Sequence, residues 1–240
     1  MKILDLFSGI GGFSLAAEWA GYETVGFCEI DVYCQKVLKK NFPDVPIFDD
    51  IRKLNRSDIN GAVDVITGGF PCQPFSVAGR KKGTQDDRDL WPQMFRVIKE
   101  FKPTWIIGEN VANFISMAFQ RTKTDLEGEG YEVQPFIIPA CAVNAPHRRD
   151  RAWIVAYSNG KGLSGFQQSN TNTIQSCKKK GFSISSFNYD NQMALPNIPK
   201  NIRVDDGVPN RVDRIKGLGN AIVPQVAYQI LKAIKKSKKD

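Results

Sequence analysis

The first 110 residues alternate short apolar runs with segments of helical periodicity, and this alternation constrains the fold more than any other feature of the sequence. The apolar runs and the helix-like segments between them follow one another at residues 2–7, 13–20, 24–29, 32–40, 64–67, 90–101 and 105–109. Strands that alternate with helices build a mostly parallel sheet with helices on both faces. The sequence therefore predicts an α/β fold with a doubly wound sheet and right-handed crossovers.

The pattern changes in the second half of the chain. Two further strand-like runs, at 134–138 and 152–157, have no clear helix between them. The stretch from Ser158 to about Asn201 is rich in Ser, Asn, Gln, Thr, Gly and Lys and has little apolar periodicity. That composition is typical of loops rather than of core elements.

Apolar spacing returns near the C-terminal end of the sequence. Ile222, Val226, Ile230 and Ile234 fall on one face of a predicted helix, and Pro224 lies in its first turn, where proline is tolerated. These changes of pattern predict one main domain and one small irregular region inserted into it, at residues 1–157 plus 217–240 and at 158–216 respectively.

Composition argues against several classes of protein. No apolar run approaches the length that spans a bilayer, and the N-terminus lacks the regions of a signal peptide, so we expect a cytoplasmic protein. The five cysteines are odd in number and include no C-x-x-C pair, and His147 is the single histidine, so we expect neither a disulfide framework nor a metal site. A net charge of +8 is suited to attracting a phosphate backbone, although basic chains are common.

A strand, a glycine turn and a helix open the chain, and this arrangement suits a nucleotide-like ligand. The glycines of Gly9-Ile-Gly-Gly12 let the backbone approach a ligand, and free amides at the helix start favour an anionic group. Glu29 ends the second strand, where an acid accepts hydrogen bonds from ribose hydroxyls, and Asp50 could meet an adenine amino group. The turn is neither G-x-G-x-x-G nor a P-loop, which favours an adenosine ligand without a pyrophosphate. A simple strand-to-helix turn would have the same spacing.

A candidate nucleophile follows the third strand of the alternating series. Cys72 lies between Pro71 and Pro74 on a stiff loop, at the end of the sheet where ligands bind. A thiolate there would be a strong nucleophile if nearby dipoles or cations lowered its pKa. The alternative is a buried structural cysteine. We expect that alternative for Cys28, Cys34 and Cys141, and an exposed thiol for Cys177.

Three charged residues could share the pocket with that cysteine. Glu109 ends the next strand, and a partly desolvated carboxyl there would have a raised pKa and could donate a proton. Arg149 and Arg151 alternate on one face of an extended segment, where two guanidinium groups could bind a phosphate or a base carbonyl. The alternative for Glu109 is a surface carboxylate, and the alternative for the two arginines is a run of solvated charges.

Taken in order, these segments resemble the cytosine-C5 DNA methyltransferase family. The matching motifs are Asp5-Leu-Phe-Ser-Gly-Ile-Gly-Gly12, Glu29, Asp50-Ile51, Gly69-Phe-Pro-Cys-Gln-Pro-Phe-Ser76, Arg88-Asp-Leu90, Glu109-Asn-Val111, Arg149-Asp-Arg151 and Gly219-Asn-Ala-Ile-Val-Pro-Gln225. The resemblance implies a Rossmann-like methyltransferase fold, with the C-terminal helix folded back onto the N-terminal lobe. Family members often have Gln where this chain has His147.

The resemblance also implies a reaction and its residues. It makes Cys72 the nucleophile towards a flipped cytosine, Glu109 the residue at cytosine N3, and Arg149 and Arg151 the residues that hold the base and its backbone. The methyl donor would be S-adenosylmethionine, which leaves as S-adenosylhomocysteine. The residues expected to hold the donor are Phe7, Gly9, Gly11, Glu29, Asp50, Ile51, Pro71, Leu90, Asn220, Ala221 and Ile222.

The expected partner is double-stranded DNA, bound by a monomer in a bacterial or virus-infected cell, with 158–216 as a short target-recognition region. Side chains expected to contact the DNA are Gln73, Ser76, Arg80, Lys81, Lys82, Arg203, Arg211 and Arg214. Three other functions compete. A methyltransferase of tRNA cytosine would share the donor pocket and Cys72. A silent DNA-binding module predicts a degraded Cys72 or Glu109, and a dinucleotide dehydrogenase predicts a G-x-G-x-x-G turn.

Overall fold

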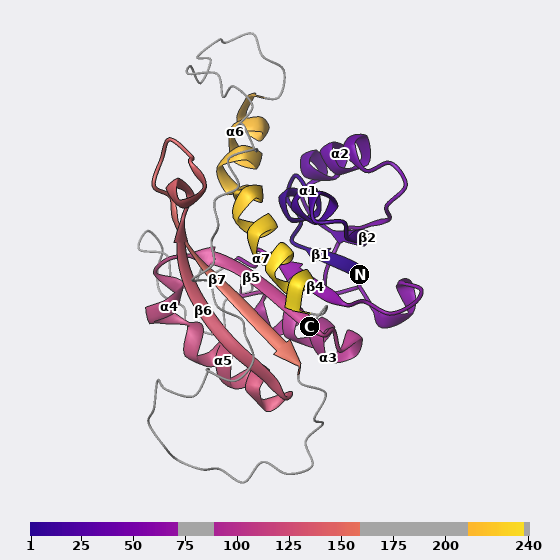
Figure 1. Ribbon diagram of the computed structural model, residues 1–240. Coiled ribbons are helices and arrows are strands. Elements are labelled where there is room, and N and C mark those ends of the chain that lie inside the picture. Colours follow the sequence, from indigo (N-terminus) through magenta and orange to yellow (C-terminus); the bar gives the residue numbers. More distant parts are fainter. Residues whose placement is uncertain (72–88, 159–210, 238–240) are drawn as a thin grey trace.

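The computed structural model describes residues 1–71, 89–158 and 211–237, and a seven-stranded sheet runs through its centre (Figure 1). Across the sheet the strands are β3 (Ile47–Phe48), β2 (Glu23–Cys28), β1 (Lys2–Leu6), β4 (Val65–Gly68), β5 (Trp105–Val111), β7 (Asp150–Ser158) and β6 (Tyr131–Pro139). The first five are parallel, whereas β7 pairs antiparallel with both β5 and β6. The predicted α/β fold with a mostly parallel sheet is confirmed.

Helices and short 3₁₀ segments connect and cover these strands (Figure 1). They are α1 (Gly12–Trp19), α2 (Val32–Asn41), η1 (Arg56–Asp58), α3 (Trp91–Phe101), α4 (Phe114–Met117), α5 (Phe119–Gly128), η4 (Ala140–Val143), α6 (Arg211–Asn220) and α7 (Pro224–Ser237). The side chain of Asp31 caps α2 by accepting from the amides of Tyr33 and Cys34, at 3.0 and 3.2 Å.

Two apolar layers enclose the sheet. One layer includes Ile3 of β1 and joins β4, β5 and β7 to α1 and α7, while the other includes Leu4 and joins the opposite faces of the same strands to α3 and α5. Adjacent residues of β1 are thus buried on opposite sides, as expected for a parallel strand covered on both faces. Most of the predicted apolar face of the last helix is present, because Val226, Ile230 and Ile234 are buried. The prediction was wrong for Ile222, which precedes α7 instead of lying on its face.

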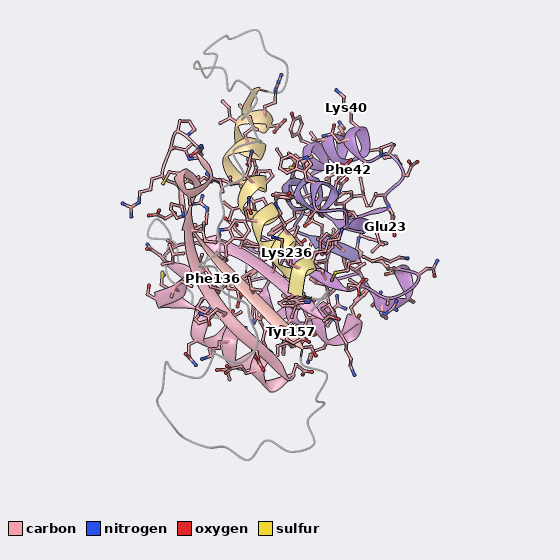
Figure 2. All side chains as sticks on the ribbon, viewed as in Figure 1. Glu23, Lys40, Phe42, Phe136, Tyr157 and Lys236 are labelled. Carbon is pink, nitrogen blue, oxygen red and sulfur yellow. The ribbon has the colours of Figure 1, made fainter. Side chains whose placement is uncertain are left out.

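The C-terminal helix lies against the N-terminal part of the chain. The Tyr22 hydroxyl donates to the carbonyl of Leu231 at 2.8 Å, and the Lys235 ammonium donates to the carbonyls of Ala20 and Gly21 at 2.8 and 3.0 Å. Figure 2 labels Lys236 near the end of α7, and Phe136 and Tyr157 on the β6–β7 hairpin. This docking agrees with the arrangement that the family resemblance implied.

Helix α6 crosses residue 216, where the sequence suggested the end of the small irregular region. The Lys216 ammonium lies 2.7 Å from an Asp31 carboxylate oxygen, so α6 is tied to the start of α2. The proposed limits of the region stay a prediction, because 159–210 lie outside the described residues. Within the part of the chain that is described, no helix is long and apolar enough to span a lipid bilayer.

Candidate functional site

The strand order reverses between β1 and β4, and ligands of doubly wound sheets bind beside the carboxyl ends of the strands at such a point. The turn after β1 has left-handed backbone at Phe7, Gly9 and Gly11, with φ of 52°, 54° and 88°. Gly11 could not be replaced easily, because a Cβ there would lie 2.9 Å from the ring of Phe42, which Figure 2 labels. A Cβ at Gly9 would have none of the described atoms within 4 Å, so the turn is open at that point.

Glu29 lies directly against this turn. Its carboxylate accepts hydrogen bonds from the amides of Gly9 and Asp31, both at 2.7 Å. The next residue, Ile30, is 68% exposed although its side chain is apolar. Ile30 was not predicted as a site residue; the signal in the sequence was its position directly after the strand-ending acid Glu29. An acid and an exposed apolar side chain therefore stand together at the end of β2.

The other expected donor-binding residues come from three segments around the same edge. Asp50 follows β3 and accepts from the Arg52 amide at 2.9 Å, and the neighbouring Ile51 is buried. Leu90 is the N-cap residue of α3. Ile222 touches the glycine turn so closely that a Cβ on Gly12 would lie 2.7 Å from its Cγ1. The 50–51 segment thus follows the strand beside β2, which ends just before Glu29, and the 220–222 segment lies against the glycine turn.

Glu109 is a nearly buried acid at the end of β5, with 9% of its surface exposed. Desolvation raises the pKa of this carboxyl to about 7, although the charges of Arg151 and Arg149 act in the opposite direction. The Arg151 Nε lies 3.0 Å from Glu109 Oε1, across the antiparallel β5–β7 pair. The expected partly desolvated carboxyl is therefore present, and near neutral pH it can hold a proton.

The end of β5 also holds the backbone that leads to Cys72. A Cβ placed on Gly69 would lie 3.4 Å from Glu109 Oε2, so this carboxylate faces the chain just after β4. The Asn110 side chain donates to the carbonyl of Phe70 at 3.0 Å. Asn110 belongs to the Glu-Asn-Val motif, but no role was predicted for it. Its buried amide fixes the backbone two residues before the expected nucleophile.

Arg149 and Arg151 differ in position. Arg149 precedes β7 with a φ of 40°, so the prediction that both arginines alternate along one extended segment is wrong. Its Nη2 donates to the carbonyls of Gly219 and Ala221 at 2.7 and 2.9 Å. Arg149 therefore holds the 219–221 segment by two hydrogen bonds, whereas Arg151 forms an ion pair with Glu109.

A second buried acid, Asp5, lies inside β1; it begins a matching motif, but no role was predicted for it from the sequence. It is 0% exposed, and the hydroxyls of Thr67 and Ser14 donate to its two oxygens at 2.8 and 3.0 Å. Desolvation raises the pKa of Asp5 to about 7, and the nearby charge of Glu29 acts in the same direction. Asp5 joins β1 to β4 and to the first turn of α1.

The cysteines that were expected to be structural divide into two kinds. Cys28 and Cys34 are buried as predicted, and burial raises the pKa of each thiol to about 12. Cys141 is exposed, so the prediction of burial was wrong. It lies in the 3₁₀ segment η4, which connects β6 to β7.

Several predicted residues lie outside the described ranges. These are Cys72, Gln73, Ser76, Arg80, Lys81, Lys82, Cys177 and Arg203, together with the side chain of Arg211. Pro71 is described and half-buried, and Arg214 is exposed on α6. Among the residues that are placed, no group of three or more His, Cys, Asp or Glu side chains could hold a metal ion.

The sheet order, the glycine turn and the acid at the end of β2 define a Rossmann-like methyltransferase. A sequence model described as C-5 cytosine-specific DNA methylase matches residues 1–207, and the chain belongs to this family.

Curated relatives and solved structures agree with this membership. The Type II methyltransferase M.HhaI of Haemophilus parahaemolyticus is 34% identical over 172 residues, which are 70% of this chain and 52% of that protein. M.PspPI of Psychrobacter is 38% identical over 161 residues, 64% of this chain and 39% of the relative. The chain therefore spans about half, or less, of the length of these relatives.

The Schizosaccharomyces pombe Dnmt2 methyltransferase structure superposes with a TM-score of 0.57 at 26% identity, covering 68% of this chain and 52% of that one. A DNA modification methyltransferase structure from an Escherichia coli prophage has the same TM-score at 27% identity, covering 66% and 47%.

Proposed function

We propose that this protein transfers a methyl group from S-adenosylmethionine to C5 of cytosine in double-stranded DNA. The observation that carries the proposal is the position of Glu109. A carboxyl with a pKa raised to about 7 faces Gly69, and its neighbour Asn110 holds the carbonyl of Phe70. A proton donor is thus set beside the backbone that enters Cys72, within the motifs of a C-5 cytosine methylase.

The residues of this chain would divide the reaction between them. Cytosine C5 is a poor nucleophile, so the Cys72 thiolate would first form a bond to C6. Glu109, protonated, would hydrogen-bond to N3 and stabilise the charge that develops there, which makes C5 electron-rich. S-adenosylmethionine, when bound, supplies the electrophilic methyl group. After a base removes the C5 proton, the C6–sulfur bond breaks and Cys72 is restored.

The described residues fit an adenosine ligand. Glu29 is fixed at the glycine turn by two backbone amides, and carboxylates in this position of a nucleotide-binding sheet accept from ribose hydroxyls. The space beside Gly9 is open, and the exposed Ile30 would give an apolar surface for the adenine ring. We assign donor binding to Phe7, Gly9, Gly11, Glu29, Ile30, Asp50, Ile51, Pro71, Leu90, Asn220, Ala221 and Ile222.

The arginines take separate roles in this proposal. Arg151 would contact the flipped base beside Glu109, because its Nε is 3.0 Å from Glu109 Oε1. Arg149 holds the 219–221 segment against the start of β7. Target cytosines are stacked inside a duplex, so the base must be rotated out before it can reach Glu109 and Arg151.

The partner in this proposal is duplex DNA, bound by a monomer in the cytoplasm. A net charge of +8 suits a phosphate backbone. Residues 158–216 would supply target recognition, and Gln73, Ser76, Arg80, Lys81, Lys82, Arg203, Arg211 and Arg214 would contact the DNA. The Type II relatives make a role in restriction-modification the natural setting.

The test uses duplex DNA and tRNA as alternative substrates with radiolabelled S-adenosylmethionine. Wild-type protein is expected to label duplex DNA, and bisulfite sequencing is expected to place 5-methylcytosine in one sequence context. Cys72→Ser should bind DNA without turnover. Cys141→Ser, which changes an exposed cysteine on the η4 segment, is the matched control and should retain full activity.

A second readout traps the covalent step. Duplex DNA with 5-fluorocytosine at the target cannot lose a proton from C5, so it should stall as a protein–DNA adduct that survives denaturing electrophoresis. Wild-type and Cys141→Ser protein should form this adduct, and Cys72→Ser should not. Methylation by Cys72→Ser would refute the nucleophile, and labelling of tRNA alone would refute the substrate.

A further inference from the structure

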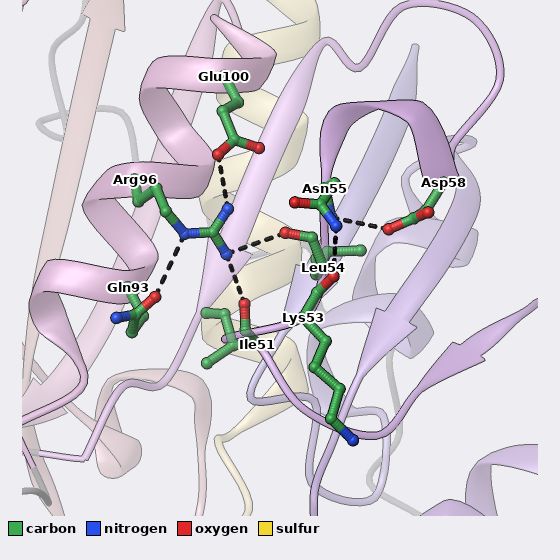
Figure 3. A network of polar contacts seen from close by, with 8 residues as sticks. All are labelled: Ile51, Lys53, Leu54, Asn55, Asp58, Gln93, Arg96 and Glu100. Carbon is green, nitrogen blue, oxygen red and sulfur yellow. Dashed lines mark hydrogen bonds and ion pairs between the residues drawn. The ribbon is translucent and has the colours of Figure 1, made fainter.

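The loop after β3 contains Asp50 and Ile51, two of the residues assigned to the methyl donor, and a single arginine from α3 holds this loop. Arg96 Nη2 donates to the carbonyls of Ile51 and Leu54 at 2.6 and 2.9 Å. Figure 3 shows the guanidinium group directed from the helix into the curve of the loop. The contact joins segments that are 45 and 42 residues apart in the sequence.

The guanidinium is itself fixed by its own helix. Arg96 Nη1 lies 2.6 Å from Glu100 Oε1, and Nε donates to Gln93 Oε1 at 3.2 Å. Arg96 is 29% exposed and Glu100 is 33% exposed, so both charges are partly shielded from water. One planar group thus makes four contacts in a fixed fork, which a lysine ammonium could not reproduce.

Other contacts hold the loop on both sides of the Arg96 contacts. The side chains of Ile51 and Leu54 are 4% and 1% exposed and pack in the apolar layer below α3. The backbone N–H of Asn55 donates to the Asp58 carboxylate at 2.7 Å, and the side-chain Nδ2 of Asn55 donates to the Lys53 carbonyl at 2.6 Å (Figure 3). The buried side chains hold one side of this loop, and Arg96 holds the carbonyls of Ile51 and Leu54 on the other.

We propose that Arg96 is a positioning residue for the adenine end of the donor pocket. This inference rests on the proposed function, because it takes S-adenosylmethionine as the ligand. Leu90, also assigned to the pocket, caps the helix that carries Arg96. Arg96 therefore sets the spacing between Leu90 and the Asp50–Ile51 edge, which meets the adenine ring and its amino group.

Arg56 offers a matched control. Its Nη1 and Nη2 donate to the carbonyls of Ile59 and Gly61 at 2.7 and 2.8 Å, so it makes the same kind of contact in the neighbouring loop. A Cβ on Gly61 would lie 3.7 Å from the Lys2 ammonium, at the start of β1. Arg56 therefore holds the opposite end of the sheet from the Gly9 turn.

The experiment measures binding rather than turnover. Calorimetry on the full chain would compare S-adenosylhomocysteine with its hypoxanthine analogue, which lacks the adenine amino group. Wild-type protein is expected to prefer the adenine form. Arg96→Lys should raise the Kd for S-adenosylhomocysteine about tenfold and reduce that preference. The reason is that the loop with Asp50 and Ile51 loses two hydrogen bonds to its carbonyls and is no longer held in place. In turnover, KM for the donor should rise while kcat changes little.

The controls separate positioning from general stability. Arg56→Lys should lower the melting temperature as Arg96→Lys does, but leave the Kd and the base preference unchanged. Glu100→Gln removes the ion pair that fixes the Arg96 guanidinium but keeps Arg96 itself, so it should raise the Kd about two- to threefold. This variant replaces Arg96→Lys in the test if Arg96→Lys does not fold.

An unchanged Kd and base preference in a folded Arg96→Lys protein would overturn the inference, as would an equal loss in Arg56→Lys. If Arg96→Lys does not fold, an unchanged Kd and base preference in Glu100→Gln would overturn it. A wild-type protein that binds no S-adenosylhomocysteine would refute the donor assignment itself.

Discussion

The interior of β1 and the end of β5 each contain a buried carboxyl group, and burial raises the pKa of both Asp5 and Glu109 to about 7. Their neighbours differ. Asp5 is sealed at 0% exposure and receives hydrogen bonds from two neutral hydroxyls, whereas Glu109 stands at the edge of the sheet beside two arginines. Desolvation is the largest cause of the raised pKa in both carboxyl groups, whereas exposure and nearby charge decide whether the group can take part in chemistry.

The largest expected difference between these acids is in catalysis. Glu109→Gln keeps the size of the side chain but removes the transferable proton, so methyl transfer to DNA should fall by about 10²- to 10⁴-fold. Asp5→Asn, the equivalent change in β1, should leave methyl transfer at pH 7 near the wild-type rate. Initial rates with labelled donor would measure both. Equal losses in the two variants would remove the functional distinction between the sites.

The next effect is on stability as a function of pH. Asp5 binds its proton more tightly in the folded state, where its pKa is about 7, than at the usual value of 3.8. Between these values the folded protein holds more protons than the unfolded chain, so the free energy of unfolding falls as pH rises from about 4 to 7.

Each pH unit in that window corresponds to about 1.4 kcal/mol at most, which gives a total of a few kcal/mol. Urea unfolding of wild-type and Asp5→Asn protein at pH 4.5 and 7 would measure the slope. Because Asn does not titrate, the variant should lose the part of the pH dependence that Asp5 contributes. An identical slope in the two proteins would contradict the raised pKa.

A smaller effect concerns the charges around Glu109. The positive charge of Arg151 lowers the pKa of Glu109, in opposition to burial. Arg151→Gln should therefore raise that pKa and move the alkaline limb of the pH–rate profile upwards by about one unit. Arg148→Gln is the control, because Arg148 is exposed and paired with Asp150 instead. A limb that stays in place in Arg151→Gln would show that Glu109 does not govern it.

The smallest effect is expected inside β1. Thr67→Val keeps the shape of the side chain but removes the hydroxyl that donates to Asp5 at 2.8 Å. The free energy of unfolding at pH 7 should fall by about 1 kcal/mol, with little change in methyl transfer. Chemical denaturation would measure this, and unchanged stability would mean that the buried hydrogen bond contributes nothing.

The sequence predicted the parts of the fold that have strong periodicity. Strands β1, β2, β4 and β5 and the last helix, α7, were expected because their apolar residues repeat regularly. Strand β3 was not expected, since two residues are too few for a pattern. Helix α6 was also missed, because Val212, Ile215 and Leu218 remain exposed and no buried stripe marks the helix. Its ion pair with Asp31 is a long-range contact that local pattern cannot reveal.

The candidate site divides in the same way. Motif order placed Glu29 beside Gly9 and Glu109 beside the chain that leads to Cys72, because the ends of parallel strands meet at one edge. The roles of Asp5 and Arg96 were not predicted. Their roles depend on burial and on partners more than 40 residues away, and a short sequence motif predicts neither the burial nor the partner.

The packing of α7 against α1 and β1 has a consequence for synthesis on the ribosome. Tyr22 finds its acceptor 209 residues later, at Leu231. The apolar side of β1 and α1, with Ile3 and Phe13, therefore lacks the cover of α7 while most of the protein is being translated. Nascent chains with such open surfaces are prone to association, so ribosome-bound chaperones would meet this surface before α7 does. Fusions that delay release of α7 would prolong that vulnerable period.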